Sequence, residues 1–206
     1  MHSGHAISAT PSGRRSSGSE TDDEILLRLI ATEDQGAMRM LFARHRVRVF
    51  RFLLRILGDD VGLAEDMVSE TFLEVWRRAG QFEGRSRALT WMLGIARHKA
   101  LSARRRRSFN DKFDGALLES IEDPADNPEV STQRTDLGAI LRECIKQLSP
   151  AHRELIDLVY YHEQSIDEAS RIVGVPPNTV KSRMFYARKC IARMMADRGI
   201  EGDCCD

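Results

Sequence analysis

The sequence predicts an all-α protein in which an acidic linker joins two small helical domains. Apolar residues recur at three- and four-residue intervals through most of the chain, and no segment alternates as a half-buried strand would. Proline and glycine interrupt the helical pattern at short intervals, as they do between helices. The formal net charge is zero, but a basic run at 97–107 is followed by an acidic excess at 111–136. This change of sign marks the boundary between the domains.

The composition excludes several classes of protein. Hydrophobic residues make up 42% of the chain, which is enough for a core, yet no run approaches the roughly 18 apolar residues of a membrane span. The N-terminus lacks the apolar segment of a secretory signal, so we expect a cytoplasmic protein. Cys144, Cys190, Cys204 and Cys205 show no CxxC spacing, so we expect reduced thiols.

The N-terminal segment is expected to be a tail followed by a helix. Serine, glycine and threonine dominate residues 1–20, and such a segment buries too little apolar surface to order itself. We therefore expect a disordered tail there. Thr21 or Asp22 can cap a first helix, whose apolar positions follow the helical period.

Three further helices complete the first domain, which we place at 21–108. The second helix ends at Gly58, because glycine readily adopts the left-handed conformation that terminates a helix. The third helix, at 63–79, has an apolar side and several acidic residues on its other sides. The fourth, at 88–107, ends in a run of arginines. Four such helices form a bundle.

The linker and the second domain follow. Residues 109–135 are acidic, contain prolines and lack sustained periodicity, so we expect a linker with at most a short turn at 116–121. Helical periodicity resumes at 136, stops at Ser149 and Pro150, and then restarts. The second domain therefore occupies 136–197, and a C-terminal tail occupies 198–206.

A helix-turn-helix is predicted near the end of the second domain. Ser165 and Glu168 have the spacing of a capping box, and Gly174 suits a tight turn after a short helix. The two prolines that follow cannot continue that helix but can precede the next one, which we expect Asn178 or Thr179 to cap.

The second helix of this motif has one apolar side and one cationic side. Val180, Met184, Ala187 and Ile191 recur at intervals of four, three and four residues, so we expect them to form a buried stripe. The segment 178–195 contains five basic residues and no acidic ones. Such a helix suits the major groove of DNA, although a solvated cationic helix would fit the same pattern.

Catalytic motifs are absent from the sequence. The histidines lack HExxH spacing, and neither a GxSxG motif nor a P-loop occurs. We therefore expect a protein that is not an enzyme and that has no cofactor, no metal site and no small-molecule substrate.

Four segments together resemble the extracytoplasmic-function (ECF) class of bacterial RNA polymerase sigma factors, within the sigma-70 superfamily. The resemblance implies an alternative sigma factor that binds core RNA polymerase and directs promoter-specific transcription initiation, in a stress or envelope response. It makes the first domain region 2, a helical bundle, and the second domain region 4, a helix-turn-helix. The segments are DDEILLRLIATEDQGAMRMLF, LGDDVGLAEDMVSETFLEVWRRAGQF, TWMLGIARHKALSARRRR and QLSPAHRELIDLVYYHEQSIDEASRIVGVPPNTVKSRMFYARKCI.

The resemblance implies three contact sets. The segment AEDMVSETFLEVW corresponds to the polymerase-docking part of region 2, and its candidates are Glu65, Asp66, Glu70, Thr71, Glu74 and Trp76. The segment that recognises and melts the minus-10 element gives Arg85, Arg87, Arg97, His98, Lys99, Arg104 and Arg105. The minus-35 recognition helix gives Asn178, Thr179, Lys181, Ser182, Arg183, Phe185, Tyr186 and Arg188.

Other interpretations fit parts of the same sequence. The acids of 64–76 could be solvated groups on a core helix, and metal binding is disfavoured because no suitably spaced histidine joins them. Trp91 is expected in the core, because apolar residues surround it in the sequence. The acidic linker could lie in the RNA exit path or be a solvated tether. The family resemblance also implies an anti-sigma factor as a partner. The alternative function is a helix-turn-helix regulator that acts without polymerase.

Overall fold

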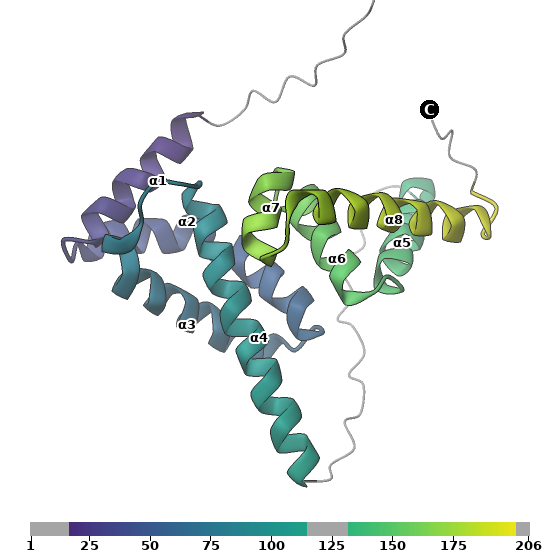
Figure 1. The fold of residues 1–206 in the computed structure, drawn as a ribbon, viewed down its shortest axis with the longest axis horizontal. Coiled ribbons are helices and arrows are strands. Elements are labelled where there is room, and N and C mark those ends of the chain that lie inside the picture. Colours follow the sequence, from purple (N-terminus) through teal and green to yellow (C-terminus); the bar gives the residue numbers. More distant parts are fainter. Residues whose placement is uncertain (1–16, 115–131, 201–206) are drawn as a thin grey trace, which may run out of the picture.

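The computed structural model describes residues 17–114 and 132–200, and every regular element in these two segments is helical. The all-α prediction is thus confirmed for the described part of the chain. The N-terminal half contains α1–α4 and the C-terminal half α5–α8 (Figure 1). Of the tail expected at 1–20, residues 17–20 belong to α1, while residues 1–16 lie outside the described residues, as do the turn at 116–121 and the pair Cys204 and Cys205. The α-helices are α1 Ser17–Ile30, α2 Gln35–Leu57, α3 Val61–Arg78, α4 Ala88–Asp114, α5 Thr132–Lys146, α6 Pro150–Ile156, α7 Ile166–Val173 and α8 Pro177–Ala196.

Local capping interactions delimit α2 and α3. The Asp34 side chain accepts a hydrogen bond of 3.0 Å from the Ala37 N–H at the start of α2. Gly58 ends α2 with a φ of 71°, which confirms the predicted left-handed terminus. Two residues later, the Asp60 carboxylate accepts from the Leu63 N–H at 2.9 Å and begins α3.

Two predicted boundaries in the first domain are wrong. Helix α1 begins at Ser17, so Thr21 and Asp22 lie inside it and do not cap it. Helix α4 continues to Asp114 instead of ending near 108. No proline or glycine occurs between 95 and 114, so nothing in this stretch forces the helix to stop at the acidic boundary.

The core of the N-terminal half surrounds α4. Leu27 of α1, Leu41 and Phe52 of α2, and Met92 and Leu93 of α4 are fully buried. Small residues continue the buried side of α4 toward its C-terminal end, which lets the neighbouring helices approach its backbone closely. These small residues are Ala96, Ala100 and Ala103.

The C-terminal half is built from short helices with side-chain caps. Ser149 caps α6 with Pro150 in its first turn, and Ser165 and Glu168 form the predicted capping box at α7. Gly174, with a φ of 75°, ends α7. A π-helical turn, η2 (Asp157–Tyr161), follows α6 and was not predicted. Single π turns arise where a helix accommodates one extra residue, and helical periodicity in a sequence does not reveal them.

The predicted cap of α8 is also wrong. The helix begins at Pro177, with Pro176 at the N-cap position, so Asn178 and Thr179 lie within its first turn. Proline suits the first helical position because its fixed φ is helical and its missing N–H would have no partner there. The expected buried stripe is confirmed at Val180, Met184 and Ala187, while Ile191 is half-buried.

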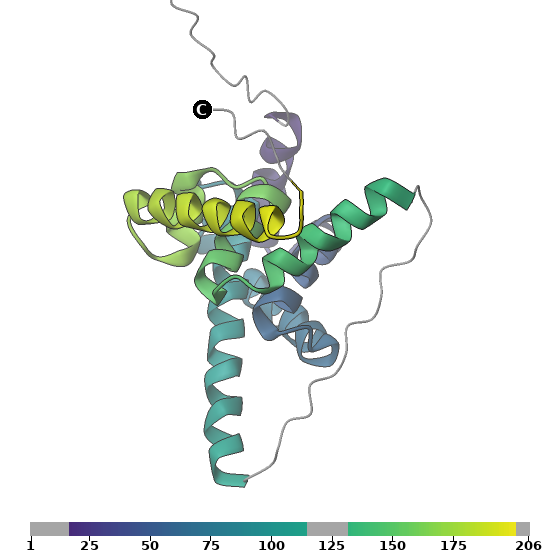
Figure 2. The same ribbon diagram turned by 90° about the vertical axis from the view of Figure 1, so that its right-hand side faces the viewer.

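The two halves pack against each other. Helix α7 lies on α4, and α6 contacts α2, so the C-terminal helices cover one side of the N-terminal bundle (Figures 1 and 2). The buried apolar residues of both halves belong to one continuous cluster. The C-terminal part of α4 extends beyond this body in both views. None of the described helices has the length and apolar character needed to cross a membrane.

A buried ion network joins α1 to α2. Asp23 is 5% exposed, and its carboxylate contacts the Arg44 guanidinium and lies 2.7 Å from His45 Nε2. Burial raises the pKa of the Asp23 carboxyl, but hydrogen bonds and charge from His45 and Arg44 outweigh it and hold the pKa below its ordinary value. The charged carboxylate therefore stabilises the packing of α1.

We expect Asp23→Asn to lower the free energy of unfolding by about 3 kcal/mol, because it removes one partner of a buried ion network. Since the folded pKa of Asp23 is depressed, its contribution is complete above the unfolded value of about 4 and is lost as the pH falls through the folded value. Urea unfolding followed by circular dichroism at pH 7 and pH 3 measures both effects. Asp22→Asn changes an exposed neighbour that has no ion pair among the described residues, and should cost less than about 0.5 kcal/mol. Equal losses for the two variants would contradict the assignment.

Candidate functional site

The outward side of α8 carries most of the predicted minus-35 residues. Val180, Met184 and Ala187 fix the rotation of the helix by burying its opposite side against α5, α6 and α7. The exposed members of the predicted set are Asn178, Lys181, Ser182, Phe185, Tyr186 and Arg188, whereas Thr179 and Arg183 are half-buried. The structure therefore brings cationic, hydroxyl, amide and aromatic groups onto one accessible surface.

Two aromatic rings dominate this surface. Phe185 is 55% exposed and Tyr186 59% exposed, and their ring centroids lie 5.5 Å apart in a T-shaped arrangement. Exposed large apolar groups next to cations are typical of surfaces that become covered by a partner. Ser182 is less available to a ligand, because its hydroxyl donates a 2.9 Å hydrogen bond to the Asn178 carbonyl.

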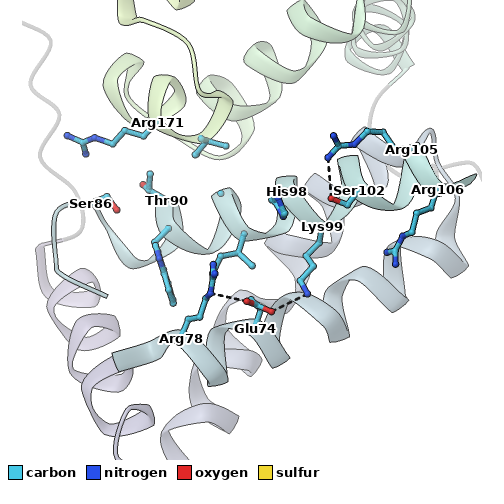
Figure 3. A pocket seen from close by; sticks show the side chains of 14 residues that line it. Glu74, Arg78, Ser86, Thr90, His98, Lys99, Ser102, Arg105, Arg106 and Arg171 are labelled. Carbon is cyan, nitrogen blue, oxygen red and sulfur yellow. Dashed lines mark hydrogen bonds and ion pairs between the residues drawn. The ribbon is translucent and has the colours of Figure 1, made fainter. Parts of the chain in front are cut away.

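A cleft of about 850 Å³ lies beside α4, bordered by α3 and α7 (Figure 3). Its floor and walls combine cations with apolar groups, which suits a strand that has both phosphates and exposed bases. The described residues that line it are Glu74, Arg78, Ser86, Thr90, Trp91, Gly94, Ile95, His98, Lys99, Ser102, Arg105, Arg106, Arg171 and Ile172. Trp91, expected in the core, is half-buried on the wall of the cleft, 5.4 Å from the Phe82 ring.

Lys99 is held by acids of α3 inside the cleft. Its Nζ lies 3.2 Å from Glu70 Oε2 and 3.2 Å from Glu74 Oε2. The hydrogen bond from Lys99 holds the pKa of the Glu74 carboxyl below its ordinary value, and the charges of Lys99 and Arg78 act in the same direction. Two residues predicted to contact polymerase therefore contact one predicted to bind DNA.

The seven predicted minus-10 residues fall into three groups. His98, Lys99 and Arg105 line the cleft. Arg104 lines a separate pocket of about 310 Å³ between α2, α4 and α6, and Arg85 is mostly exposed with its Nε 2.5 Å from Glu83. Arg87 and Arg97 form the third group, because their guanidinium groups contact the C-terminal half.

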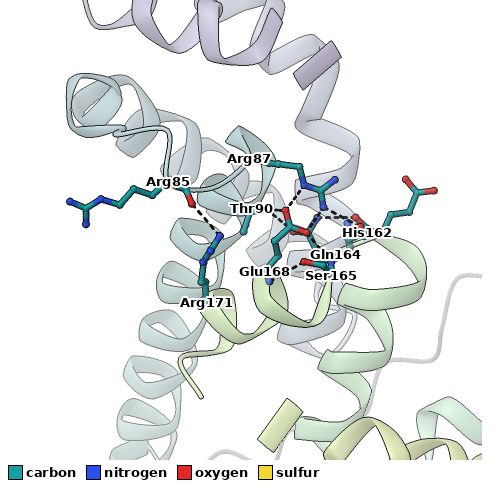
Figure 4. A network of polar contacts seen from close by, with 9 residues as sticks. Arg85, Arg87, Thr90, His162, Gln164, Ser165, Glu168 and Arg171 are labelled. Atoms are coloured by element: carbon teal, nitrogen blue, oxygen red, sulfur yellow. Dashed lines mark hydrogen bonds and ion pairs between the residues drawn. The ribbon is translucent and has the colours of Figure 1, made fainter. Parts of the chain in front are cut away.

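Arg87 pairs with Glu168 at the start of α7 (Figure 4). Its Nε contacts Glu168 Oε1, and its Nη2 donates to Oε2 at 2.6 Å and to the Glu163 carbonyl at 3.1 Å. The Thr90 hydroxyl beside it donates to Gln164 Oε1 at 2.7 Å. This junction joins the first turn of α4 to the first turn of α7.

Arg97, further along α4, forms the second pair of this kind. Its Nε lies 2.6 Å from Glu154 Oε1, and its Nη2 lies 3.3 Å from Glu154 Oε2. Both side chains are largely shielded from solvent, with 22% and 14% exposed. Like Arg87, Arg97 therefore forms a bidentate contact with a carboxylate of the C-terminal half.

The Glu168 side chain also takes part in the capping box of α7. Its Oε2 accepts a 2.8 Å hydrogen bond from the Ser165 N–H. Burial raises the pKa of the Glu168 carboxyl, but the hydrogen bond from Arg87, followed by those from Ser165, holds it below the ordinary value. The carboxylate is therefore charged at neutral pH, and its pairing with Arg87 weakens only as the pH falls through the lowered pKa.

The predicted polymerase set is only partly at the surface of α3. Glu65, Asp66 and Glu70 are exposed, while Glu74 and Trp76 are half-buried. Thr71 does not lie on the surface. It is fully buried, and its hydroxyl donates a 2.6 Å hydrogen bond to the Met67 carbonyl. Its place four residues after Met67 on the apolar side of the helix explains this position.

Three arginines of the cleft lie outside the predicted minus-10 set: Arg78, Arg106, which follows the predicted Arg105, and Arg171. Arg78 follows Glu74 by four residues and pairs with it at 3.0 Å, so its helical spacing from Glu74 was the available signal. Arg171 borders the cleft from α7, and its Nη1 donates to the Arg85 carbonyl at 3.2 Å. Nothing in the sequence brings Arg171 close to Arg85, because the two lie in different domains.

Metal chemistry has no support in the described segments, where no three His, Cys, Asp or Glu side chains are grouped so as to hold an ion. Cys144 is buried and Cys190 exposed, and both are free thiols.

Comparisons with protein families match both halves of the chain. Residues 41–109 match the family "Sigma-70 region 2", and residues 138–191 match the family "Sigma-70, region 4". The first match contains α3 and most of α2 and α4, and the second contains α6, α7 and most of α5 and α8.

Curated relatives match the chain over most of its length. The "ECF RNA polymerase sigma factor SigK" of Mycobacterium tuberculosis (strain H37Rv) is 31% identical over 173 residues, which cover 83% of this chain and 92% of the relative. A protein of the same description from Mycobacterium sp. (strain KMS) is 30% identical over 166 residues, which cover 80% of this chain and 86% of the relative.

Solved structures share the fold. The sigma factor RpoE, in complex with the anti-sigma factor NepR from Bartonella quintana, has a TM-score of 0.62 at 24% identity and covers 77% of this chain and 96% of its own. CnrH, in complex with the cytosolic domain of CnrY, has a TM-score of 0.61 at 22% identity and covers 85% of this chain and 98% of its own.

Substitutions on the two sides of α8 should differ in their effect on stability, because one side is exposed and the other lies in the core. We expect Phe185→Ala to change the free energy of unfolding by less than about 0.5 kcal/mol, because the ring is mostly solvent-exposed. Met184→Ala should cost about 2 to 4 kcal/mol, because it leaves a cavity beneath the helix. Thermal and urea unfolding of both variants measure the difference. A large loss for Phe185→Ala would show that its ring supports the fold.

Proposed function

This chain belongs to the ECF RNA polymerase sigma factors, alternative sigma factors that direct the polymerase to promoters, and we propose which of its surfaces perform that function. Region 2 comprises α1–α4, and region 4 comprises α5–α8. The observation that carries the assignment is the accessible side of α8, which is cationic and aromatic while its opposite side is buried. A polymerase-independent regulator would leave the family match at 41–109 without a role.

Region 4 is proposed to bind the minus-35 element through α8. Lys181 and Arg188 can neutralise phosphates or donate to guanine edges, and Asn178 can pair with a base edge. Phe185 and Tyr186 can supply apolar contact with thymine methyl groups in the major groove. The half-buried Thr179 and Arg183 flank this surface and would act at its edge.

Region 2 is proposed to hold the melted minus-10 strand in the cleft beside α4. His98, Lys99 and Arg105 supply cations for its backbone, and Trp91 with Phe82 offers ring surface for an unstacked base. Arg78 and Arg106 line the same cleft and extend the predicted set. The protein makes and breaks no covalent bond in this process and needs no cofactor.

Core polymerase is proposed to dock on the exposed acids of α3. Glu65 and Asp66 have no ion pair among the described residues, so they can pair with basic groups of the polymerase without first losing a partner. Glu70 and Glu74 would have to release Lys99. Docking at these two residues would therefore free a cation for the DNA strand beside it.

The proposed cellular setting follows from the function. A factor that works on core polymerase and promoter DNA acts in the cytoplasm. We propose an anti-sigma factor as a further partner, because one structural relative was solved with such a partner. Each DNA-binding module is small, and a tether between them raises their effective concentration only when the polymerase fixes their separation. The free chain should therefore bind promoter duplex weakly.

Purified core RNA polymerase provides the main test of the docking surface and of the function. The wild-type chain should co-elute with core enzyme on size exclusion and direct transcription from a subset of a promoter library. Asp66→Lys should weaken core binding at least tenfold by placing like charges opposite each other. Asp22→Lys makes the same charge change on α1 and should bind as wild type does. Failure of the wild-type chain to bind or redirect core enzyme would contradict the function.

Promoter binding by the holoenzyme tests α8. We expect Lys181→Ala to weaken binding about tenfold and to reduce the slope of log affinity against log salt by about one, because one phosphate contact is lost. Arg28→Ala removes one positive charge from an exposed position on α1 and should change neither quantity. Filter binding or fluorescence anisotropy across a salt series measures both. An unchanged slope for Lys181→Ala would remove Lys181 from the phosphate contacts.

A further inference from the structure

The contacts between regions 2 and 4 use the groups that region 2 would use to hold DNA. Arg87 and Arg97 belong to the predicted minus-10 set, and each guanidinium is engaged by a carboxylate of region 4. Arg171 and Ile172 of α7 line the same cleft as His98. We infer that region 4 inhibits the free protein by covering part of the strand-binding surface of region 2, with Glu154 and Glu168 in the places of DNA phosphates. This inference rests on the proposed role of the cleft.

Carboxylates are suitable substitutes for phosphates at these positions. A guanidinium group presents two parallel N–H donors, which match the two oxygens of a carboxylate or of a phosphate equally well. Arg87 donates to both oxygens of Glu168, and Arg97 contacts both oxygens of Glu154. A DNA strand that reached either arginine would therefore have to displace a carboxylate of region 4.

Buried polar contacts fix the position of α7 on α4. Thr90 is 3% exposed and Gln164 2% exposed, and they form a direct hydrogen bond of 2.7 Å. The Gln164 amide also donates to the His162 carbonyl at 2.9 Å. Buried polar groups need such partners, so this pair favours one arrangement of the two regions over sliding alternatives.

A second contact, away from the DNA cleft, anchors the π-helical turn on α2. Asp157, 3% exposed, lies 2.8 Å from Arg55 Nε and 3.2 Å from His162 Nε2. The Phe52 and His162 rings meet edge to face at 5.4 Å, and the Arg55 guanidinium lies 4.4 Å from the Tyr161 ring centre. The closed arrangement is thus supported by groups that the DNA surface does not use.

The packing of region 4 on region 2 affects the two DNA-binding surfaces differently. The outward side of α8 remains exposed, because α8 contacts its own region through the buried stripe. Only the strand-binding surface of region 2 is affected, where region 4 engages Arg87 and Arg97 and borders the cleft with Arg171 and Ile172. The free protein would therefore present its minus-35 surface while withholding its strand-binding surface, and the inhibition would act on promoter melting more than on duplex contact.

The inhibition can be measured as a change in affinity for single-stranded DNA. If only an open fraction of molecules binds, the apparent dissociation constant is the intrinsic one divided by that fraction. The double variant Glu154→Gln/Glu168→Gln removes both carboxylate charges, and glutamine still suits the capping box of α7. We expect the full-length double variant to bind a fluorescein-labelled random 12-nucleotide DNA strand about tenfold more tightly than wild type.

A matched control separates opening from the added positive charge. Asp167→Asn/Glu143→Gln makes the same net charge change at exposed positions of α7 and α5 that have no ion pair among the described residues. It should bind the strand within twofold of wild type. The single variant Glu154→Gln, which leaves the α7 cap untouched, should give an intermediate gain of about threefold.

Small-angle X-ray scattering of the same proteins reports the domain arrangement. The inference is supported if the double variant is more extended than wild type and binds the strand more tightly than the charge control. Two results overturn it: an extended variant that binds no better than the control, or a variant as compact as wild type with unchanged affinity. These readouts need no polymerase. The result for inhibition by region 4 is therefore independent of the result for transcription. A chain that does not direct transcription can still show the inhibition, and a working sigma factor can lack it.

Discussion

The packing of α4 is the constraint on which the rest of the structure depends. One side of this helix supplies Met92, Leu93 and a series of buried alanines to the region 2 core. A second side of α4 contacts α7 and the segment before it, where Thr90 donates a hydrogen bond to Gln164. On the same helix, Arg97 pairs with Glu154 of α6. The remaining surface carries His98, Lys99, Arg105 and Arg106, which line the cleft. A single helix therefore contributes to the stability of one domain, to the position of the other and to the proposed site for DNA.

This arrangement places opposing demands on the same side chains. Arg87 and Arg97 stabilise the closed protein through charged, largely desolvated contacts, and would stabilise bound DNA through similar ones. Both cannot occur at once, so closure and strand binding compete. Binding of core polymerase would shift this balance if the polymerase holds the two regions at a separation that α7 and α4 cannot span. The energy of docking then offsets the loss of the contacts between the regions.

Much of the fold could be predicted because local rules determine it. Gly58, Ser149, Ser165 and Gly174 cap helices as their residue types suggest, and the stripe of α8 is buried where its spacing places it. The start of α8 was misplaced because the proline at its first position fits the helix better than a side-chain cap does. The π-helical turn has no signature in apolar spacing.

The candidate site was less predictable, because its character depends on contacts between distant parts of the chain. The resemblance identified cations along α4, but their sequence positions could not show that Arg87 and Arg97 pair with region 4 while Lys99 pairs with α3. For Thr71 a local contact matters instead. This residue, predicted on the polymerase-binding surface, is buried on the apolar side of α3, because its hydroxyl donates a hydrogen bond to the Met67 carbonyl of the same helix.

The distance between region 2 and region 4 in the free and polymerase-bound protein tests the central claim most directly. Spin labels at the exposed Cys190 of α8 and at an Arg28→Cys substitution on α1, with Cys204 and Cys205 replaced by serine, report this distance by pulsed electron resonance. Sharing of α4 predicts one well-defined distance in the free protein and a clearly longer one after core polymerase binds. The same distance in both states would show that α7 does not leave α4, and would contradict the account.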